Sequence, residues 1–271
     1  KAFHAAGKKV VVVLNIGGVI ETASWKNKPD AILLAWQAGQ EGGNSVADVL
    51  TGKACPSGKL PMTFPVSFKD HASSLNFPLD GATSDFGFDR AEVTEKKNLW
   101  DYTKYEEDIF VGYRYFDSFG KNVSYPFGYG LSYTQFNYGT PSVKTENGVV
   151  TVSVEIENAG KVAGREVAQV YVKAPDAKAA NKPEHELRAF GKTKALKPGE
   201  KQTLTMSFPI ADLASFDAEK AAWVVAPGQY DVKVAASSRD IRGNAPISVE
   251  AKETPSKNLL TPQVTLNTLK R

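Results

Sequence analysis

The chain has 271 residues, of which 42% are hydrophobic and 23% charged, and its 33 basic and 30 acidic residues give a formal net charge of +3. This composition is typical of a globular protein with two domains of about 100 to 150 residues each. The charges are mixed along the chain without a basic stripe, which argues against nucleic acid as a partner. No apolar run approaches the roughly 20 residues that cross a bilayer, so we expect no association through a membrane span.

The single cysteine, Cys55, excludes an internal disulfide framework. One cysteine fits the periplasm and the cytoplasm alike, and we favour a periplasmic or secreted bacterial protein. The first residues read as the last turns of a helix that stops at Gly7. We therefore expect the chain to be a fragment or a processed product.

Residues 1–66 predict part of an α/β domain. The nearly continuous apolar runs at 10–15 and 31–36 are typical of parallel strands, which are covered on both faces. A Gly-rich loop at 37–43 precedes a short helix at 46–50, for which Asn44 or Ser45 provides the cap. This unit is too short to make a stable doubly wound domain alone.

Residues 67–135 are rich in aromatic side chains and interrupted by proline and glycine. Disordered linkers are poor in aromatics, so we expect an ordered segment that connects the two halves of the chain.

Residues 136–250 predict a β-sandwich. In the run 167–173, Ala168, Val170 and Val172 share an apolar face opposite Gln169 and Tyr171, which predicts a half-buried strand. The other expected strands are residues 142–145, 149–158, 184–190, 203–208, 223–225, 230–235 and 247–249. Seven or eight short strands in about 110 residues are typical of an immunoglobulin or fibronectin type III domain. The tail at 251–271 has no clear period, so it either lies over another part of the molecule or is disordered.

Four residues are candidates for a domain interface or an active-site rim. Gln40 and Glu41 lie in the Gly-rich loop after a predicted parallel strand, where open α/β sheets bind ligands. An acid ahead of a helix also stabilises the helix dipole, and we favour this structural role for Glu41. Tyr105, followed by three acids, and Arg114, between two tyrosines, form either a sugar-stacking platform or an interface sealed by paired charges. We favour the interface.

No metal site is predicted. The three histidines lie far apart, with no cysteine other than Cys55 to complete a zinc site or a nucleophilic pair. Asp80, Asp85 and Asp89 miss the spacing of a calcium-binding EF-hand loop, so we expect them in a solvated loop.

Several motifs resemble glycoside hydrolase family 3, the β-glucosidase and β-xylosidase family. The stretches Ala-Trp-Gln-Ala-Gly-Gln-Glu-Gly-Gly at 35–43 and Pro-Ser-Gly-Lys-Leu-Pro-Met-Thr-Phe-Pro at 56–65 resemble the C-terminal α/β domain of that family. Motifs that resemble its connecting segment and its last domain follow at 105–109, 112–117, 125–134, 184–187, 196–200 and 236–241.

The resemblance implies an α/β plus all-β fold. Its first part is a partial parallel α/β sandwich domain (1–66), followed by the connecting segment (67–135). Its second part is a fibronectin type III-like, immunoglobulin-like β-sandwich (136–250), followed by the C-terminal tail (251–271).

The resemblance also implies an exo-acting, retaining β-glycosidase, and a β-glucosidase in the first place. Such enzymes use two carboxylates roughly 5 Å apart and need no cofactor. In the family the nucleophile is an Asp of an N-terminal (β/α)8 barrel, and the acid/base is commonly a Glu ahead of the strand that corresponds to 10–15. Neither position exists in this chain, and Glu41 matches a later motif of the family. We therefore assign no catalytic residue and expect this chain alone to be inactive.

The implied partners are the N-terminal barrel, in the same protein or as a separate chain, and a β-glucoside or oligosaccharide substrate. The oligomeric state stays open, a homo-oligomer included. The alternative is a non-catalytic β-sandwich module that binds or spaces other domains.

Overall fold

The structure is a computed structural model that describes residues 2–75, 105–262 and 265–271. The elements of its first half are α1 (Ala2–Ala5), β1 (Val11–Leu14), β2 (Ala31–Leu34), α2 (Gly42–Leu50), β3 (Phe64–Pro65), the 3₁₀ helices η1 (Phe68–Asp70) and η2 (Ala72–Leu75), α4 (Tyr113–Ser118) and β4 (Val123–Tyr125). Those of its second half are β5 (Phe136–Tyr138), β6 (Ser142–Glu146), β7 (Val149–Asn158), β8 (Val167–Lys173), β9 (Glu186–Lys192), β10 (Lys201–Pro209), η3 (Ile210–Leu213), β11 (Ser215–Asp217), β12 (Ala222–Val225), β13 (Gly228–Ser237), β14 (Asp240–Val249) and β15 (Lys252–Pro255).

The N-terminal unit contains the predicted parallel pair. β1 and β2 run side by side from the pair Val11 and Ala31 to the pair Leu14 and Leu34. Among residues 2–62, only the side chain of Thr22 is buried. Both faces of this small sheet therefore remain partly open, although apolar strands of this kind are normally covered on both sides.

Two local predictions in this unit were wrong. α2 begins at Gly42 rather than at residue 46, and its N-cap is Glu41 rather than Asn44 or Ser45. The amide of Ser45 donates to the carbonyl of Glu41 at 2.9 Å, so the helical bonds extend through the glycine pair despite its low helix propensity. β2 ends at Leu34, and Trp36, predicted to be in the strand, has a left-handed backbone with φ of 53°.

The second half is a sandwich of two antiparallel sheets. One sheet has the order β14-β13-β8-β9; the other has the order β10-β7-β5, with β6 also paired to β7. Every second residue of β7 is buried, from Val150 to Ile156, and these side chains meet Val170, Val172 and Val232 of the facing sheet. Each such buried side chain stabilises the fold by about 1.5–3 kcal/mol. The α/β plus β-sandwich prediction is confirmed.

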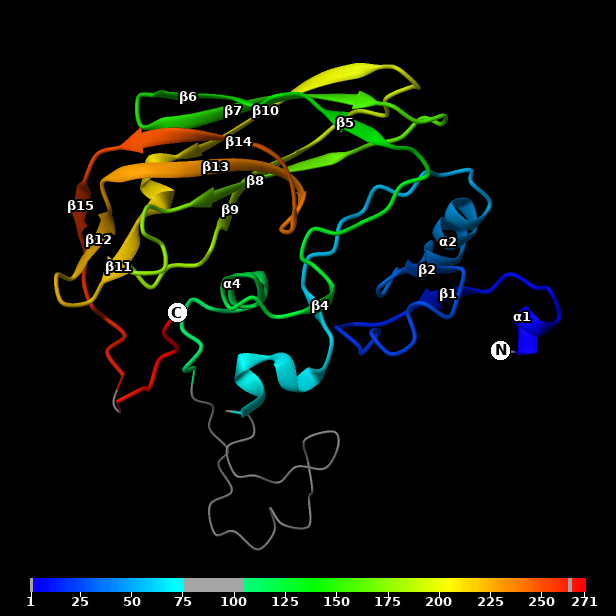
Figure 1. Cartoon of the computed structure of the whole chain (residues 1–271), viewed down its shortest axis with the longest axis horizontal. Coiled ribbons are helices and arrows are strands. Elements are labelled where there is room, and N and C mark those ends of the chain that lie inside the picture. Colours follow the sequence, from blue (N-terminus) through cyan, green and yellow to red (C-terminus); the bar gives the residue numbers. More distant parts are fainter. Residues whose placement is uncertain (1, 76–104, 263–264) are drawn as a thin grey trace, which may run out of the picture.

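β8 is buried on both faces, so the prediction of a half-buried strand was wrong. Gln169 and Tyr171 are as inaccessible as Val170. The alternation correctly placed the apolar residues on the sandwich core. The polar face is covered as well, because α4 and the residues around Phe127 pack against it (Figure 1).

In the second half of the chain, from β5 onward, three strands and most of a fourth were not predicted. β5 and β11 have three residues each, too few for a recognisable period. β14 contains Gly243 and Pro246, which weaken a strand signal; Pro246 is tolerated because β14 is the edge of its sheet. β15 pairs with β12, so the first residues of the tail join a three-stranded sheet with β11.

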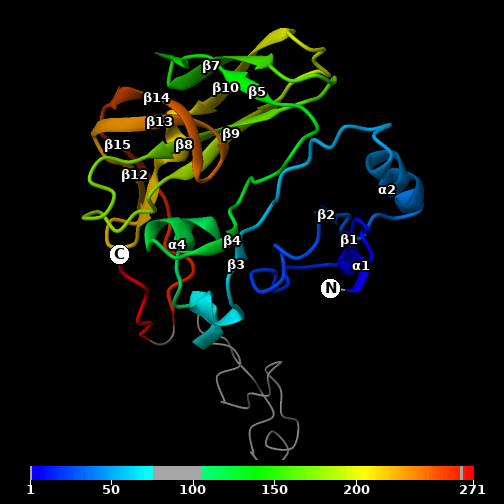
Figure 2. The ribbon, with the colours of Figure 1, turned by 45° about the vertical axis from the view of Figure 1, so that its right-hand side comes forward.

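The N-terminal unit and the sandwich lie on opposite sides of a central connection (Figures 1 and 2). β3 pairs with β4 at Phe64 and Tyr125, which brings the two ends of the connecting segment together. A buried hydrogen bond of 2.7 Å between the hydroxyls of Thr22 and Ser124 adds to this link. These contacts attach β4 of the predicted connecting segment to the N-terminal unit.

Candidate functional site

A hollow lies at the carboxyl ends of the two parallel strands. Its volume is about 760 Å³, and its lining comprises Val13, Asn15, Ala35, Trp36, Gln37, Ala38, Gly39, Gly42, Gly43 and Val46. The strand ends, the Gly-rich loop and the first turn of α2 therefore surround it. This is the place in an open α/β sheet where ligands bind.

Trp36 gives this hollow a strained wall. A bulky residue with positive φ is a genuine outlier that costs of order 1–3 kcal/mol, and such strain clusters at functional sites. The ring of Trp36 packs on Phe64 at a centroid distance of 6.3 Å, and Phe64 in turn meets Tyr125 at 6.3 Å. Packing against the β3 and β4 pair thus holds the loop in its unusual conformation. Sequence reasoning missed this residue because its backbone conformation has no local signal.

Gln40 and Glu41 are both exposed and are not among the residues that line the hollow. Glu41 occupies the N-cap of α2 without a capping bond from its side chain. Its Oε2 instead accepts a hydrogen bond of 2.6 Å from Nδ2 of Asn44. The charge lies at the helix N-terminus, where it is electrostatically favourable.

Tyr105 and Arg114 differ in their surroundings. The side chain of Tyr105 is exposed at 76%. Arg114, in α4, lies 3.7 Å from Oε1 of Glu186 in β9, and Arg188 donates to the other oxygen of Glu186 at 2.7 Å. Arg114 therefore joins α4 to the edge of the sandwich.

Tyr113 is the centre of the contact between α4 and the sandwich. Its ring stacks on Phe127 at 4.7 Å and meets the edge of Tyr171 at 5.8 Å. Its hydroxyl accepts a hydrogen bond of 2.8 Å from the amide of Leu187 in β9. Burial raises the pKa of Tyr113, so the phenol stays neutral.

A polar cluster of Asp117, His185 and Arg239 lies beside this ring, with Asp117 and His185 buried and Arg239 partly exposed. Asp117 Oδ1 accepts a hydrogen bond of 2.6 Å from Nε of Arg239, and Asp117 Oδ2 lies 3.3 Å from Nε2 of His185. Arg239 also donates to the carbonyls of Phe116 and Lys121, at 3.2 and 2.8 Å. The three side chains connect α4, the loop before β9 and the turn after β13. Charge pairs of this kind are structural unless a ligand reaches them.

Three further contacts join residues 58–60 of the N-terminal unit to the connecting segment and to the sandwich. Nζ of Lys59 lies 2.8 Å from Oε1 of Glu166, with both side chains almost buried. The amide of Leu60 donates to the carbonyl of Tyr129 at 2.8 Å. Gly130 lies so close to Gly58 that an added Cβ would come within 2.2 Å of the Gly58 carbonyl oxygen. A glycine is therefore needed at this crossing.

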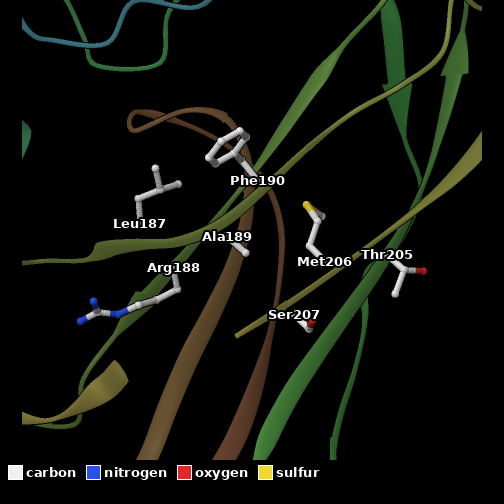
Figure 3. Close-up of a pocket in the computed structure, with 7 residues that line it drawn as sticks. All are labelled: Leu187, Arg188, Ala189, Phe190, Thr205, Met206 and Ser207. Atoms are coloured by element: carbon white, nitrogen blue, oxygen red, sulfur yellow. The ribbon is translucent and has the colours of Figure 1, made fainter. Parts of the chain in front are cut away.

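A second hollow opens between β9 and β10, the unpaired edges of the two sheets (Figure 3). Its volume is about 520 Å³, and its lining residues are Leu187, Arg188, Ala189, Phe190, Thr205, Met206 and Ser207. The pairing register skips Arg188, which marks a β-bulge at this edge. Bulges protect exposed edges from pairing with other chains. This hollow is the open side of the sandwich, with a single charged side chain in its lining.

Within the described ranges, no group of His, Cys, Asp and Glu side chains has the arrangement of a metal site. Asp80, Asp85 and Asp89 lie outside the described residues. No described helix is long and apolar enough to cross a membrane.

The comparisons with known proteins agree with this architecture. The model of the glycosyl hydrolase family 3 C-terminal domain matches residues 1–133, and that of the fibronectin type III-like domain matches residues 166–238. The chain belongs to glycosyl hydrolase family 3. It carries the C-terminal region of that family, and the resemblance stated from the motifs is confirmed.

Similar proteins include a β-glucosidase of Ruminococcus albus, 41% identical over 82% of this chain and 22% of that protein. An exo-α-(1→6)-L-arabinopyranosidase of Bifidobacterium breve is 38% identical over 91% of this chain and 30% of its own length. The structure of β-glucosidase 3B from Thermotoga neapolitana in complex with α-D-glucose has a TM-score of 0.81 and 46% identity, over 93% of this chain and 33% of that one. The chain therefore spans about a fifth to a third of the length of these proteins.

Proposed function

We propose that this chain is the C-terminal part of a retaining, exo-acting β-glycosidase that removes terminal non-reducing β-D-glucosyl residues. The observation that carries the proposal is the structural similarity to the Thermotoga neapolitana β-glucosidase over 93% of the chain. The named relatives differ in the sugar they release, so this region of the family is compatible with more than one glycone.

The proposed role of the chain is to complete and hold an active site formed elsewhere. Retaining hydrolysis needs a nucleophilic carboxylate and an acid/base carboxylate. We assign both to an N-terminal barrel and the residues that follow it, as the family resemblance implies. The exposed valines of β1, Val11 and Val13, support this arrangement, because apolar strand faces need a cover.

The test is to express the chain alone and together with the polypeptide encoded upstream of it, and to assay both with aryl β-D-glucoside and aryl α-L-arabinopyranoside. We expect no hydrolysis by the chain alone and hydrolysis of the glucoside by the complete protein. A 2-fluoro-glucoside, which traps the covalent intermediate, should add mass only to a peptide outside residues 1–271.

Two results would contradict the proposal. A label on a peptide of this chain would refute the assignment of the nucleophile to the barrel. A complete, folded protein without activity on either glycoside would instead favour the non-catalytic module.

A further inference from the structure

The last seven residues of the chain contact two segments that are far from them in sequence. The amide of Leu269 donates to the carbonyl of Glu106 at 2.7 Å, and the amide of Asn267 donates to Glu106 Oε1 at 3.2 Å. Both bonds reach the turn at 105–109, which begins the second described part of the connecting segment. The tail thus holds this turn through the backbone as well as the side chain of one residue.

Arg271 makes the second attachment. Its amide donates to Oδ1 of Asn181 at 2.8 Å, its Nη1 donates to the carbonyl of Lys182 at 3.2 Å, and its Nη2 donates to the carboxylate of Glu184. The guanidinium is exposed at only 12%. Charge-assisted bonds of a nearly buried arginine are among the stronger polar contacts in proteins.

Glu184 is already a shared partner within the sandwich. Its Oε1 lies 2.6 Å from Nζ of Lys173, and its amide donates to Oγ of Ser118 in α4 at 2.8 Å. Arg271 therefore docks on a carboxylate that also pairs with Lys173, on a residue whose backbone is bonded to Ser118.

The chain ahead of this segment is attached differently. The amide of Ser256 donates to the carbonyl of Ala221 at 2.8 Å, next to β12 and β15. The side chains at 256–262 are all exposed, Leu259 and Leu260 at 79% and 91%. Residues 265–271 are thus held by their own hydrogen bonds, because the side chains at 256–262 do not pack against the molecule.

The turn that they hold also differs from the residues after it. Phe110 is fully buried and meets the ring of Phe119 at 5.2 Å, so the segment from Phe110 onward has an apolar anchor. Tyr105 is exposed, and Asp108 has a left-handed backbone with φ of 53°. The bonds from the tail are made at Glu106, which precedes the apolar anchor in the sequence.

We propose that residues 265–271 form a releasable clasp that docks on Glu106 and Glu184 and keeps the turn at 105–109 against the sandwich. Docking and release of the clasp control the order of the turn at 105–109, without unfolding the sandwich. This inference rests on the contacts of the tail alone and is independent of the proposed catalytic function.

Hydrogen exchange measured by mass spectrometry on the full chain and on a variant that ends at residue 264 tests the clasp. We expect amides at 105–109 and 181–184 to exchange about 10-fold faster in the shortened protein. Amides of α4 and β13 should be unchanged. Arg271→Ala should reproduce part of the effect, whereas Lys270→Ala, a change at an exposed neighbour, should not.

A second measurement follows the removal of Arg271 by a carboxypeptidase specific for basic residues. We expect removal from the chain to be about 10-fold slower than from a free peptide of residues 265–271, because the docked guanidinium is protected. Equal rates would overturn the proposal. Unchanged exchange at 105–109 after truncation, or faster exchange throughout β8 and β13, would overturn it as well.

Discussion

At the scale of single residues, Asp117 joins three parts of the chain through one buried carboxylate. Burial by itself would raise its pKa, but the hydrogen bonds from His185 and Arg239 hold the pKa of Asp117 below the ordinary value of an aspartate. The ionised form is therefore the form that the folded state favours. Its loss should weaken the contact between α4 and the sandwich.

We expect Asp117→Asn to lower the free energy of unfolding at neutral pH by roughly 1–3 kcal/mol, because the buried carboxylate loses its charge-assisted hydrogen bond to the partly exposed Arg239. The folded-state pKa lies below the unfolded value of about 3.9, so the carboxylate contributes fully above that value. This contribution is lost as the pH falls through the folded-state pKa. Urea unfolding of both proteins from neutral pH downward should show the difference shrinking in acid.

The matched control is Asp48→Asn, since Asp48 pairs with Lys53 at the surface. We expect this change to alter the free energy of unfolding by no more than about 0.5 kcal/mol. A difference between wild type and Asp117→Asn that stays constant down to about pH 2 would argue against an ionic role.

At the scale of elements, the pair β3 and β4 fastens the N-terminal unit to the rest. Phe64 is almost fully buried between Trp36 and Tyr125. Its ring thus contacts both Trp36, next to the Gly-rich loop, and Tyr125 of β4. Losing it should release the loop and leave the sandwich intact.

We expect Phe64→Ala to cost about 3–5 kcal/mol locally, the usual range for deleting a buried phenylalanine ring. Limited proteolysis should then cut residues 1–62 rapidly while the fragment from 136 to 255 persists. Phe68→Ala is the control, because the ring of Phe68 is exposed at 70% and should change little. Simultaneous cleavage throughout the sandwich would show that the two parts unfold as one unit.

At the scale of the whole molecule, burial is concentrated in the sandwich. The main hydrophobic core lies between its two sheets, whereas among residues 2–62 only Thr22 is buried. In proteins the free energy of local opening is highest where buried apolar contacts are most numerous. The N-terminal unit should therefore open far more often than the sandwich.

We expect amides of β1 and β2 to exchange at least about 100-fold faster than those of β7, β8 and β13 in the isolated chain. Addition of the N-terminal part of the complete protein should slow β1 and β2 selectively. Equal exchange rates of β1 and β7 amides in the isolated chain would contradict this difference in local stability. They would also contradict the idea that β1 and β2 need an N-terminal part to cover them.

Much of the fold was predictable because its signals are local. The alternation at 149–158 coincides with β7, and Asn147 and Gly148 both have positive φ in the hairpin turn ahead of it. Of the four candidate site residues, Arg114 lies at a contact between α4 and β9. A place at the rim of an active site stays a prediction for all four. Trp36, His185 and Arg239 were not singled out, since their importance arises from neighbours that the sequence does not bring together.

The sequence by itself determined which stretches become strands, where the hairpins turn and to which family the chain belongs, because periodicity, turn residues and motifs are properties of neighbouring residues. Only the tertiary structure decided which surfaces those strands hide. Asp117 and Arg239 are 122 residues apart, and Asn267 and Glu106 are 161 apart. Contacts at such separations depend on how preformed elements pack, so the second face of β8 and the docking of the tail had no local signature.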